Sequence, residues 1–151
     1  MPGGKFKIRS AFAGTYRRSV SDPDLDSNGS VLTMKAGVDI FGGFAGIETG
    51  VVQRWPDPSP VVYSILSGDT NGDDAGTSGL SDNSWHVVRG SNNASLDGFE
   101  ITAGHAAGTG GGDTYYGGGV YNESSSPTLT NVTISGNTAT ASKSTLLAHA
   151  L

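Results

Sequence analysis

The chain has 151 residues, of which 35% are hydrophobic and 15% charged, with 24 glycines, no cysteine and a net charge of −5. This length suffices for one domain with a sizeable core, and the acidic balance argues against nucleic acid and anionic membranes as partners. The lack of cysteine excludes disulfides and thiolate chemistry. No apolar run approaches the roughly 20 residues that span a bilayer, so no transmembrane segment is expected.

The first residues do not read as a signal peptide. Met1 is followed by Pro-Gly-Gly-Lys, and the apolar segment that a signal peptide needs does not follow. The sequence starts as if in the middle of a fold. Either the protein is cytoplasmic, or it is a secreted or cell-surface protein whose signal peptide is not included in this sequence, and we expect the second.

Short strand-like segments follow one another along the chain, almost all bounded by Gly, Asn, Asp, Ser or Pro. Helical periodicity is nearly absent before residue 142. The predicted strands are residues 5–12, 31–34, 38–41, 61–66, 85–88, 96–101, 120–121 and 129–134. This composition of short strands and tight turns predicts an all-β fold.

Two of these segments match each other. Residues 95–104 align with residues 128–137, and Leu96 falls on Leu129 at an offset of 129 − 96 = 33 residues. Both contain an apolar residue, two turn-type residues and an apolar–polar–apolar triplet, which predicts a strand, a corner and a second strand. The alternation places one face of each strand inward.

Repetition at this period is typical of a solenoid, in which each coil buries its apolar face against the next. We predict a right-handed parallel β-helix of about five or six coils over residues 1–139. Residues 140–151 form a tail or a short capping helix. If the tail does not cap the stack, its open end predicts a homo-oligomer. A two-sheet antiparallel sandwich is the alternative fold. The predicted core residues are Val38, Ile40, Leu66, Val88, Leu96, Ile101, Leu129 and Ile134.

The second half of the chain resembles a known repeat. Residues 117–122 read Gly-Gly-Gly-Val-Tyr-Asn, and residues 134–137 read Ile-Ser-Gly-Asn. They are similar to the repeat of polymorphic outer-membrane-protein-like β-helix proteins, which pairs Gly-Gly-Ala-hydrophobic with Phe-x-x-Asn. Gly119 stands at the Ala position and Ile134 at the Phe position.

Residues 41–48, Phe-Gly-Gly-Phe-Ala-Gly-Ile-Glu, and residues 64–69 resemble the first coils of the same bacterial proteins. The resemblance extends over about residues 12–139. It implies a large exported or surface-anchored protein, in some cases an adhesin, of which this chain would be an N-terminal fragment or a minimal version.

The candidate structural residues follow from this pattern. An asparagine at an inward turn can hydrogen-bond to the backbone of neighbouring coils, or it can simply occupy a left-handed turn. The candidates are Asn137 first, then Asn122 and Asn131, together with Gly117, Gly118 and Gly119.

Two acidic loops are candidate calcium sites, because carboxylate and amide oxygens are the ligands that Ca²⁺ prefers. One contains Asp24, Asp26 and Asn28, as in the first half of an EF-hand loop, but position 12 of that loop is Lys35 rather than Glu. The other contains Asp69, Asn71, Asp73 and Asp74. Solvated turns of the same composition are the alternative.

Aromatic and histidine residues give weaker signals. Tyr115 and Tyr116 lie in a Gly-rich loop and are candidate ligand-binding residues for a sugar ring or a protein; alternatively, one tyrosine covers the core edge. His86 is expected to point outward from its strand, and the three histidines lack metal-ligand spacing.

No catalytic residues are proposed, because the serines lack a Gly-x-Ser-x-Gly elbow. We expect a non-enzymatic secreted or cell-surface β-helix module of adhesin type, stabilised by Ca²⁺, that binds carbohydrate or a protein receptor. A carbohydrate-active β-helix enzyme, such as a polysaccharide lyase or hydrolase, is the alternative. Glu100 and Asp39 are the acids expected on outward strand positions.

Overall fold

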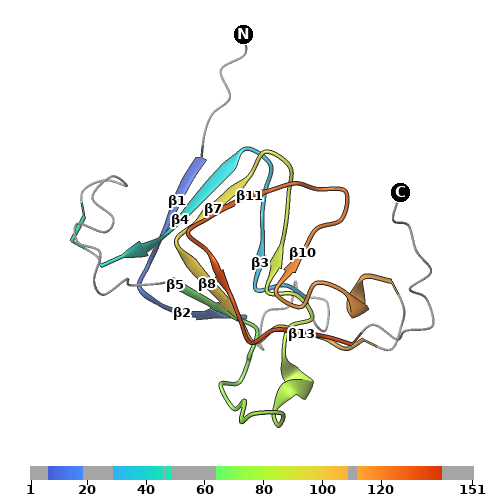
Figure 1. The fold of residues 1–151 in the computed structure, drawn as a ribbon. Helices are drawn as coiled ribbons and strands as arrows, with labels where there is room; N and C mark the ends of the chain where they lie inside the picture. Colours follow the sequence, from blue (N-terminus) through green and yellow to red (C-terminus); the bar gives the residue numbers. More distant parts are fainter. Residues whose placement is uncertain (1–6, 19–28, 46, 49–63, 109–111, 141–151) are drawn as a thin grey trace.

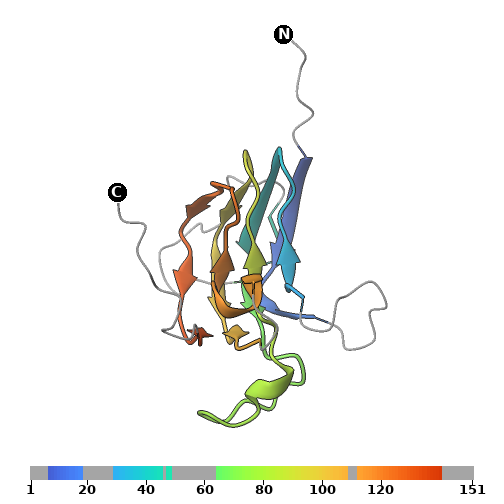
Figure 2. The same ribbon diagram turned by 90° about the vertical axis from the view of Figure 1, so that its right-hand side faces the viewer.

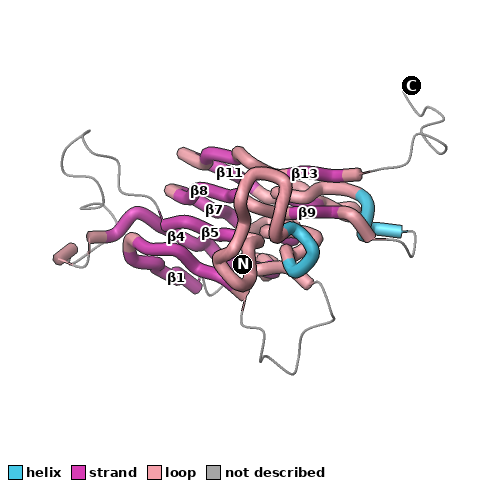
Figure 3. The backbone as a smooth tube through the Cα atoms, turned by 90° about the horizontal axis from the view of Figure 1, so that it is seen from below, coloured by secondary structure: helices cyan, strands magenta, loops and turns pink. Residues whose placement is uncertain are grey.

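The computed structural model describes residues 7–18, 29–45, 47–48, 64–108 and 112–140. This part of the chain is mainly β and contains no α-helix. Its helical segments are two short 3₁₀ turns, η2 (Leu80–Asp82) and η3 (Gly112–Tyr115). Figure 3 shows these turns beside the layers of strands. The expected tail or capping helix at residues 140–151 lies almost wholly outside the described residues.

The strands form parallel sheets. Each time the chain returns to a sheet, it adds one strand beside the previous one, and we call each such return a pass. Every pairing between named strands is parallel. The first sheet has the order β1 (Lys7–Phe12), β4 (Val38–Phe44), β7 (Ser95–Asp97) and β11 (Thr128–Thr130). The second has the order β2 (Gly14–Arg17), β5 (Ser64–Ser67), β8 (Phe99–Thr102) and β12 (Thr133–Ile134).

A third sheet joins β3 (Leu32–Thr33), β6 (Val88–Arg89) and β10 (Val120–Tyr121), and β9 (His105–Ala106) pairs with β13 (Thr138–Ala139). Figure 1 shows the passes overlaid around a common interior, and Figure 2 shows them side by side, from the first pass in blue to the last in red. The all-β class and the parallel arrangement of the described strands are therefore as expected. The alternative prediction, an antiparallel sandwich, does not fit these pairings.

The predicted 33-residue repeat matches the register of the last two passes. Leu96 pairs with Leu129, and Ile101 pairs with Ile134. The corner between the two strands is also repeated, because Gly98 and Asn131 occupy the same place at φ values of 82° and 49°. Both lie in the left-handed region, which glycine and asparagine adopt most readily. The turn-type residues in the pattern therefore mark a real corner.

The described strands differ from the prediction in number of passes. Each of the two larger sheets has four strands in the described residues, fewer than the five or six coils expected. The eight predicted strands suggested more passes because the segments between them gave no sign of which strands lie in the same pass. Strands β2, β9 and β13 were not predicted, because they are short and rich in Gly, Thr and Ala.

The core consists of apolar columns that run from pass to pass. In the first sheet, Leu96 is fully buried between Ile40 and Leu129, which are its partners in the neighbouring strands and are both half-buried. In the third sheet, Val88 is fully buried between Leu32 and Val120, which are again half-buried. Leu129 and Val120, in strands at the edge of their sheets, are thus less buried than Leu96 and Val88, which have a strand on each side. Ile40 is half-buried although β4 lies between β1 and β7, where its partner in β1 is Arg9.

We expect Leu96→Ala to lower the free energy of unfolding by about 2 to 5 kcal/mol, because it leaves a cavity at a fully buried position. Leu129→Ala removes the same atoms from the same column, at a half-buried position, and should cost clearly less. Urea unfolding followed by circular dichroism measures both. Equal losses for the two variants would contradict the dependence of burial on neighbouring passes.

Candidate functional site

A loop between β5 and β6 carries the main cluster of acidic side chains in the described residues. It leaves the second sheet at Gly68, whose N–H donates to the Thr102 carbonyl at 2.9 Å, and it returns at Ser84, whose N–H donates to the Gly68 carbonyl at 2.9 Å. The two ends of the loop are thereby held together, and residues 69–83 project from the stack, as the green segment at the bottom of Figure 1 shows.

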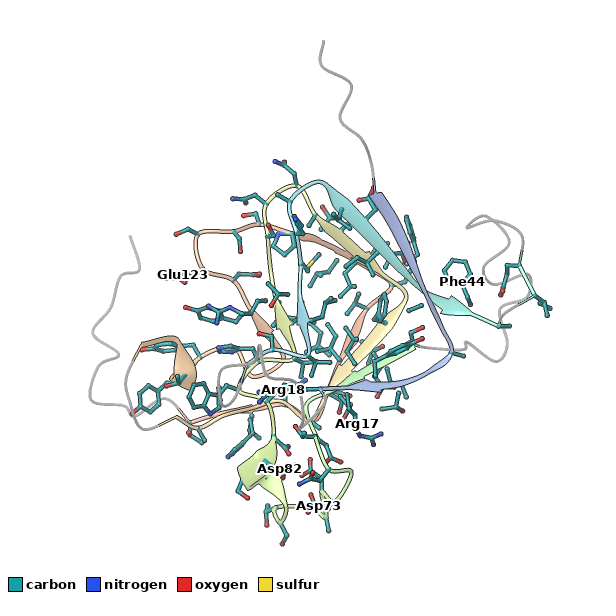
Figure 4. The ribbon with its side chains drawn as sticks, turned by 180° about the vertical axis from the view of Figure 1, so that it is seen from behind. Arg17, Arg18, Phe44, Asp73, Asp82 and Glu123 are labelled. Atoms are coloured by element: carbon teal, nitrogen blue, oxygen red, sulfur yellow. The ribbon has the colours of Figure 1, made fainter. Side chains whose placement is uncertain are left out.

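Three carboxylates meet on this loop. Asp69, Asp73 and Asp82 each offer an oxygen, and these oxygens all lie within 4.8 Å of one another. Asp69 is buried, Asp82 is half-buried and Asp73 is exposed. Figure 4 shows Asp73 and Asp82 together on the loop. Like charges at this distance repel one another, so a cation in their midst would stabilise the group.

Local hydrogen bonds set the shape of the loop. Asp69 Oδ1 accepts the N–H groups of Gly72 and Asp73 at 2.6 and 3.2 Å, which folds the chain back on itself in an Asx-type turn. Gly72 has a φ of 77°, a conformation that suits glycine. Asp82 Oδ2 accepts the Asn71 N–H at 3.1 Å, joining the far end of the loop to its start.

These bonds use one oxygen of Asp69 and one of Asp82, so each carboxylate keeps a second oxygen for an ion. Three carboxylates with nearby carbonyl oxygens and water are a donor set that a hard cation such as Ca²⁺ accepts. The Arg17 guanidinium of β2 lies 3.7 Å from where a β-carbon on Gly72 would be, so its positive charge offsets part of the negative charge of the loop and works against a bound cation. The residues present therefore could hold a metal ion.

The predicted calcium ligands fall into three groups. Asp69 and Asp73 belong to the cluster, whereas Asp74 Oδ2 instead accepts a hydrogen bond from Asn83 at 2.9 Å, and Asn71 contributes its backbone N–H. Asp24, Asp26 and Asn28 lie outside the described residues. The sequence did not single out Asp82, because it is distant in the chain. Asp82 joins the cluster because the closed loop brings residue 82 back beside residue 69.

Asn83 fastens the loop to the next pass. It is 2% exposed, and its Nδ2 donates to the Ala103 carbonyl at 2.9 Å as well as to Asp74. On the opposite side of the same corner, Asn137 Oδ1 accepts the Gly104 N–H at 2.8 Å, and its Nδ2 donates to the Ile101 carbonyl at 2.9 Å. Two asparagines from neighbouring passes thus hold one corner, residues 101–104, from both sides.

The other structural candidates are placed differently. Asn131 Nδ2 donates to Asp97 Oδ1 at 3.0 Å, across to the neighbouring pass, and the Asn122 side chain covers Gly90. Gly117, Gly118 and Gly119 lie where other segments of the chain come close to them. A β-carbon on Gly118 would stand 2.1 Å from the Thr138 carbonyl oxygen, and the nearest atoms to a β-carbon on Gly117 and on Gly119 would stand 2.6 and 2.9 Å away.

The aromatic candidates do not form one surface. Tyr116 is 48% exposed, while Tyr115, at the end of η3, is half-buried. His86 is 1% exposed, so the expectation that it points outward is wrong. Its ring stacks on Tyr121 with centroids 4.5 Å apart, and Nδ1 lies 3.1 Å from the Gly117 carbonyl. Alternation failed here because the segment before β6 turns before the strand begins.

Comparison of the chain with protein-family models, with curated proteins and with solved structures found no match. In the described residues, no helix has the length and apolar character needed to cross a membrane.

We expect Asn83→Ala to lower the free energy of unfolding by about 1 to 3 kcal/mol, because Asn83 is itself buried and its loss leaves the half-buried Ala103 carbonyl without this donor. Asn92→Ala is a matched control: Asn92 also bonds two backbone groups of the next pass, at Ser124 and Ser126, but it is exposed and water can replace it. Chemical unfolding compares the two. A loss for Asn92→Ala as large as that for Asn83→Ala would contradict this explanation.

Proposed function

We propose that this chain is a stretch of right-handed parallel β-helix and acts as a non-enzymatic binding or structural module of adhesin type. The observation that carries the proposal is the in-register parallel pairing of successive passes in each sheet. A right-handed path is the expected one, because crossovers between parallel strands of one sheet are right-handed in about 98% of cases.

The use of the polar side chains on the sheets supports a structural role over a catalytic one. Asp39 Oδ1 accepts a hydrogen bond from Ser95 Oγ at 2.5 Å, and Asp97 accepts one from Asn131. Each of these acids ties one pass to the next. A carbohydrate-active enzyme needs a group of outward carboxylates directed at a substrate. Asp39 and Asp97 are engaged with their neighbours, and Glu100, the other acid expected to face outward, is the single acid of β8.

The proposed module is secreted or exposed on a bacterial cell surface, with carbohydrate or a protein receptor as its partner. The resemblance of residues 117–122 and 134–137 to the repeat of polymorphic outer-membrane-protein-like β-helix proteins supports this placement. Tyr116, with 48% of its surface exposed on the segment after η3, is the aromatic side chain best placed to meet such a ligand.

We further propose that Ca²⁺ binds at Asp69, Asp73 and Asp82 and stabilises the loop. The support is the convergence of three carboxylates from both ends of a closed loop. Extracellular calcium modules bind weakly, with dissociation constants of about 0.1 to 1 mM, so millimolar calcium in the medium would keep such a site occupied.

Calcium at about a hundredfold excess over its dissociation constant should raise Tm by about 5 to 10 °C relative to the same protein with a chelator. Asp73→Asn and Asp82→Asn should remove most of this rise, because each takes one charge from the cluster. Thermal melts followed by circular dichroism provide the measurement, with magnesium as the comparison ion.

Asp97→Asn serves as the matched control, since Asp97 is an acid of the same type that lies on a strand away from the loop. It should keep the full calcium-dependent rise in Tm. If calcium leaves the Tm of the native chain unchanged, the proposed calcium site is wrong. If the rise in Tm remains in both loop variants, calcium binds at a different site.

Incubation with a panel of acidic polysaccharides should yield no unsaturated products, which are detected by their ultraviolet absorbance. The non-enzymatic proposal fails if product accumulates and its formation is abolished by Asp69→Ala or Asp73→Ala. Those substitutions matter because they alter the described acidic cluster while leaving the acids of the strands in place.

A further inference from the structure

The parallel register of the second sheet places Arg17 beside the base of the acidic loop. Arg17 of β2 pairs with Ser67, which is the last residue of β5 before the chain leaves the sheet. Arg17 is exposed, whereas its neighbour Arg18 is half-buried. Figure 4 shows Arg17 on the side of the stack from which the loop with Asp73 and Asp82 projects. The position of this arginine is therefore set by strand pairing and not by the loop itself.

The Arg17 guanidinium faces Gly72 without binding an acid directly. Its Nη2, Cζ and Nε atoms would lie 3.7, 3.8 and 3.9 Å from a β-carbon on Gly72, so the flat of the group rather than one corner faces this residue. Among the described residues, no ion pair within 4.0 Å joins it to a carboxylate of the cluster. The Gly72 N–H donates to Asp69 Oδ1 at 2.6 Å. The guanidinium thus lies within about one Debye length of the cluster, which is about 10 Å at 0.1 M salt.

The loop has no positive charge of its own. Residues 64–88 include four aspartates and neither lysine nor arginine. The carboxylates of Asp69, Asp73 and Asp82 repel one another at their mutual distances of at most 4.8 Å. A compensating charge must therefore come from another pass or from solution, and Arg17 is the cation that the neighbouring strand brings to the loop.

An amide oxygen in the same loop lacks a hydrogen-bond donor. Asn83 is 2% exposed, and its Oδ1 is buried and accepts no hydrogen bond. Asn83 directly follows Asp82 in the chain, and its Nδ2 donates to Asp74, the neighbour of Asp73. A buried acceptor without a donor is unfavourable, and a cation or its bound water would satisfy this oxygen. Independently of the acidic cluster, this oxygen points to a ligand at the loop.

We propose that Arg17 and Ca²⁺ are alternative counter-charges of this loop, so that Arg17 sets its calcium affinity. This inference rests on the proposed calcium site. Without calcium, the guanidinium offsets the repulsion among the carboxylates and stabilises the closed loop. With calcium, the same charge repels the ion and holds the affinity down, in the range of about 0.1 to 1 mM that is typical of extracellular modules. A single charge therefore has opposite effects on the two states of the loop.

Calcium titration calorimetry, together with thermal melts in chelator, tests the proposal on the whole chain. Arg17→Gln should lower the calcium Kd about two- to fivefold at low salt, because it removes one positive charge near the ion. The same variant should lower the Tm in chelator. Arg17→Lys keeps the charge and should stay close to the native chain in both measurements. A merely structural role for Arg17 would instead weaken calcium binding and calcium-free stability together.

Arg89→Gln is the matched control, because it removes the same charge from the third sheet, where Arg89 lies 4.0 Å from Glu123. Its calcium Kd should equal that of the native chain. The difference in Kd between the native chain and Arg17→Gln should also disappear in 1 M NaCl, where the Debye length is about 3 Å. Circular dichroism checks that all three variants keep the native fold.

The native titration separates the two ways in which the proposal can fail. If the native chain binds calcium and Arg17→Gln leaves the Kd unchanged or raises it, the role of Arg17 is wrong and the calcium site stands. If the native chain takes up no calcium, the proposed calcium site is wrong, and the role of Arg17 in its affinity is wrong with it.

Discussion

Each pass of this chain depends on its neighbours to bury its apolar side chains. One pass is a single strand thick, so its inward residues depend for their burial on the inward residues of the other sheets and on residues of the same column in the neighbouring passes. Leu96 and Val88 lie in central strands and are fully buried, whereas Leu129 and Val120 hold the same column positions at the edge and are half-buried. The core is thus a set of columns whose stability grows with the number of stacked passes.

Polar side chains reinforce this stacking where the backbone turns. Asn83 from one pass and Asn137 from another hold the corner at residues 101–104. They form hydrogen bonds to two of its carbonyl oxygens and to one of its N–H groups. Ser64, fully buried, works similarly in the first passes: its Oγ donates to the Ala11 carbonyl and accepts the Gly43 N–H, both at 3.0 Å. Such bonds satisfy the backbone at corners, where the sheet ladder is interrupted.

In this architecture, the residues that hold the stack together are different from the residues of the candidate site. Strand residues are committed to neighbouring passes, so a ligand can be accommodated most easily by segments that leave the stack. The loop at residues 69–83 is such a segment, and its two ends are held together at Gly68 and Ser84. This closure brings Asp82 to Asp69 and Asp73. Ligand chemistry on this fold is therefore expected in its connections, in line with the general tendency of loops on a rigid scaffold to carry function.

Local sequence pattern determined the all-β class, most of the strands and the 33-residue register, because alternation and turn residues act over a few positions. Gly98 and Asn131 are good examples, since their residue types alone predict the corner that their φ values confirm. Tertiary structure decided what depends on distant contacts. Asp82 joins the acidic cluster only when the loop closes, His86 is buried only when Tyr121 stacks on it, and Ile134 is exposed only because its strand lies at the edge. The physical reason is that burial and clustering depend on which passes lie on either side, and no local pattern contains that information.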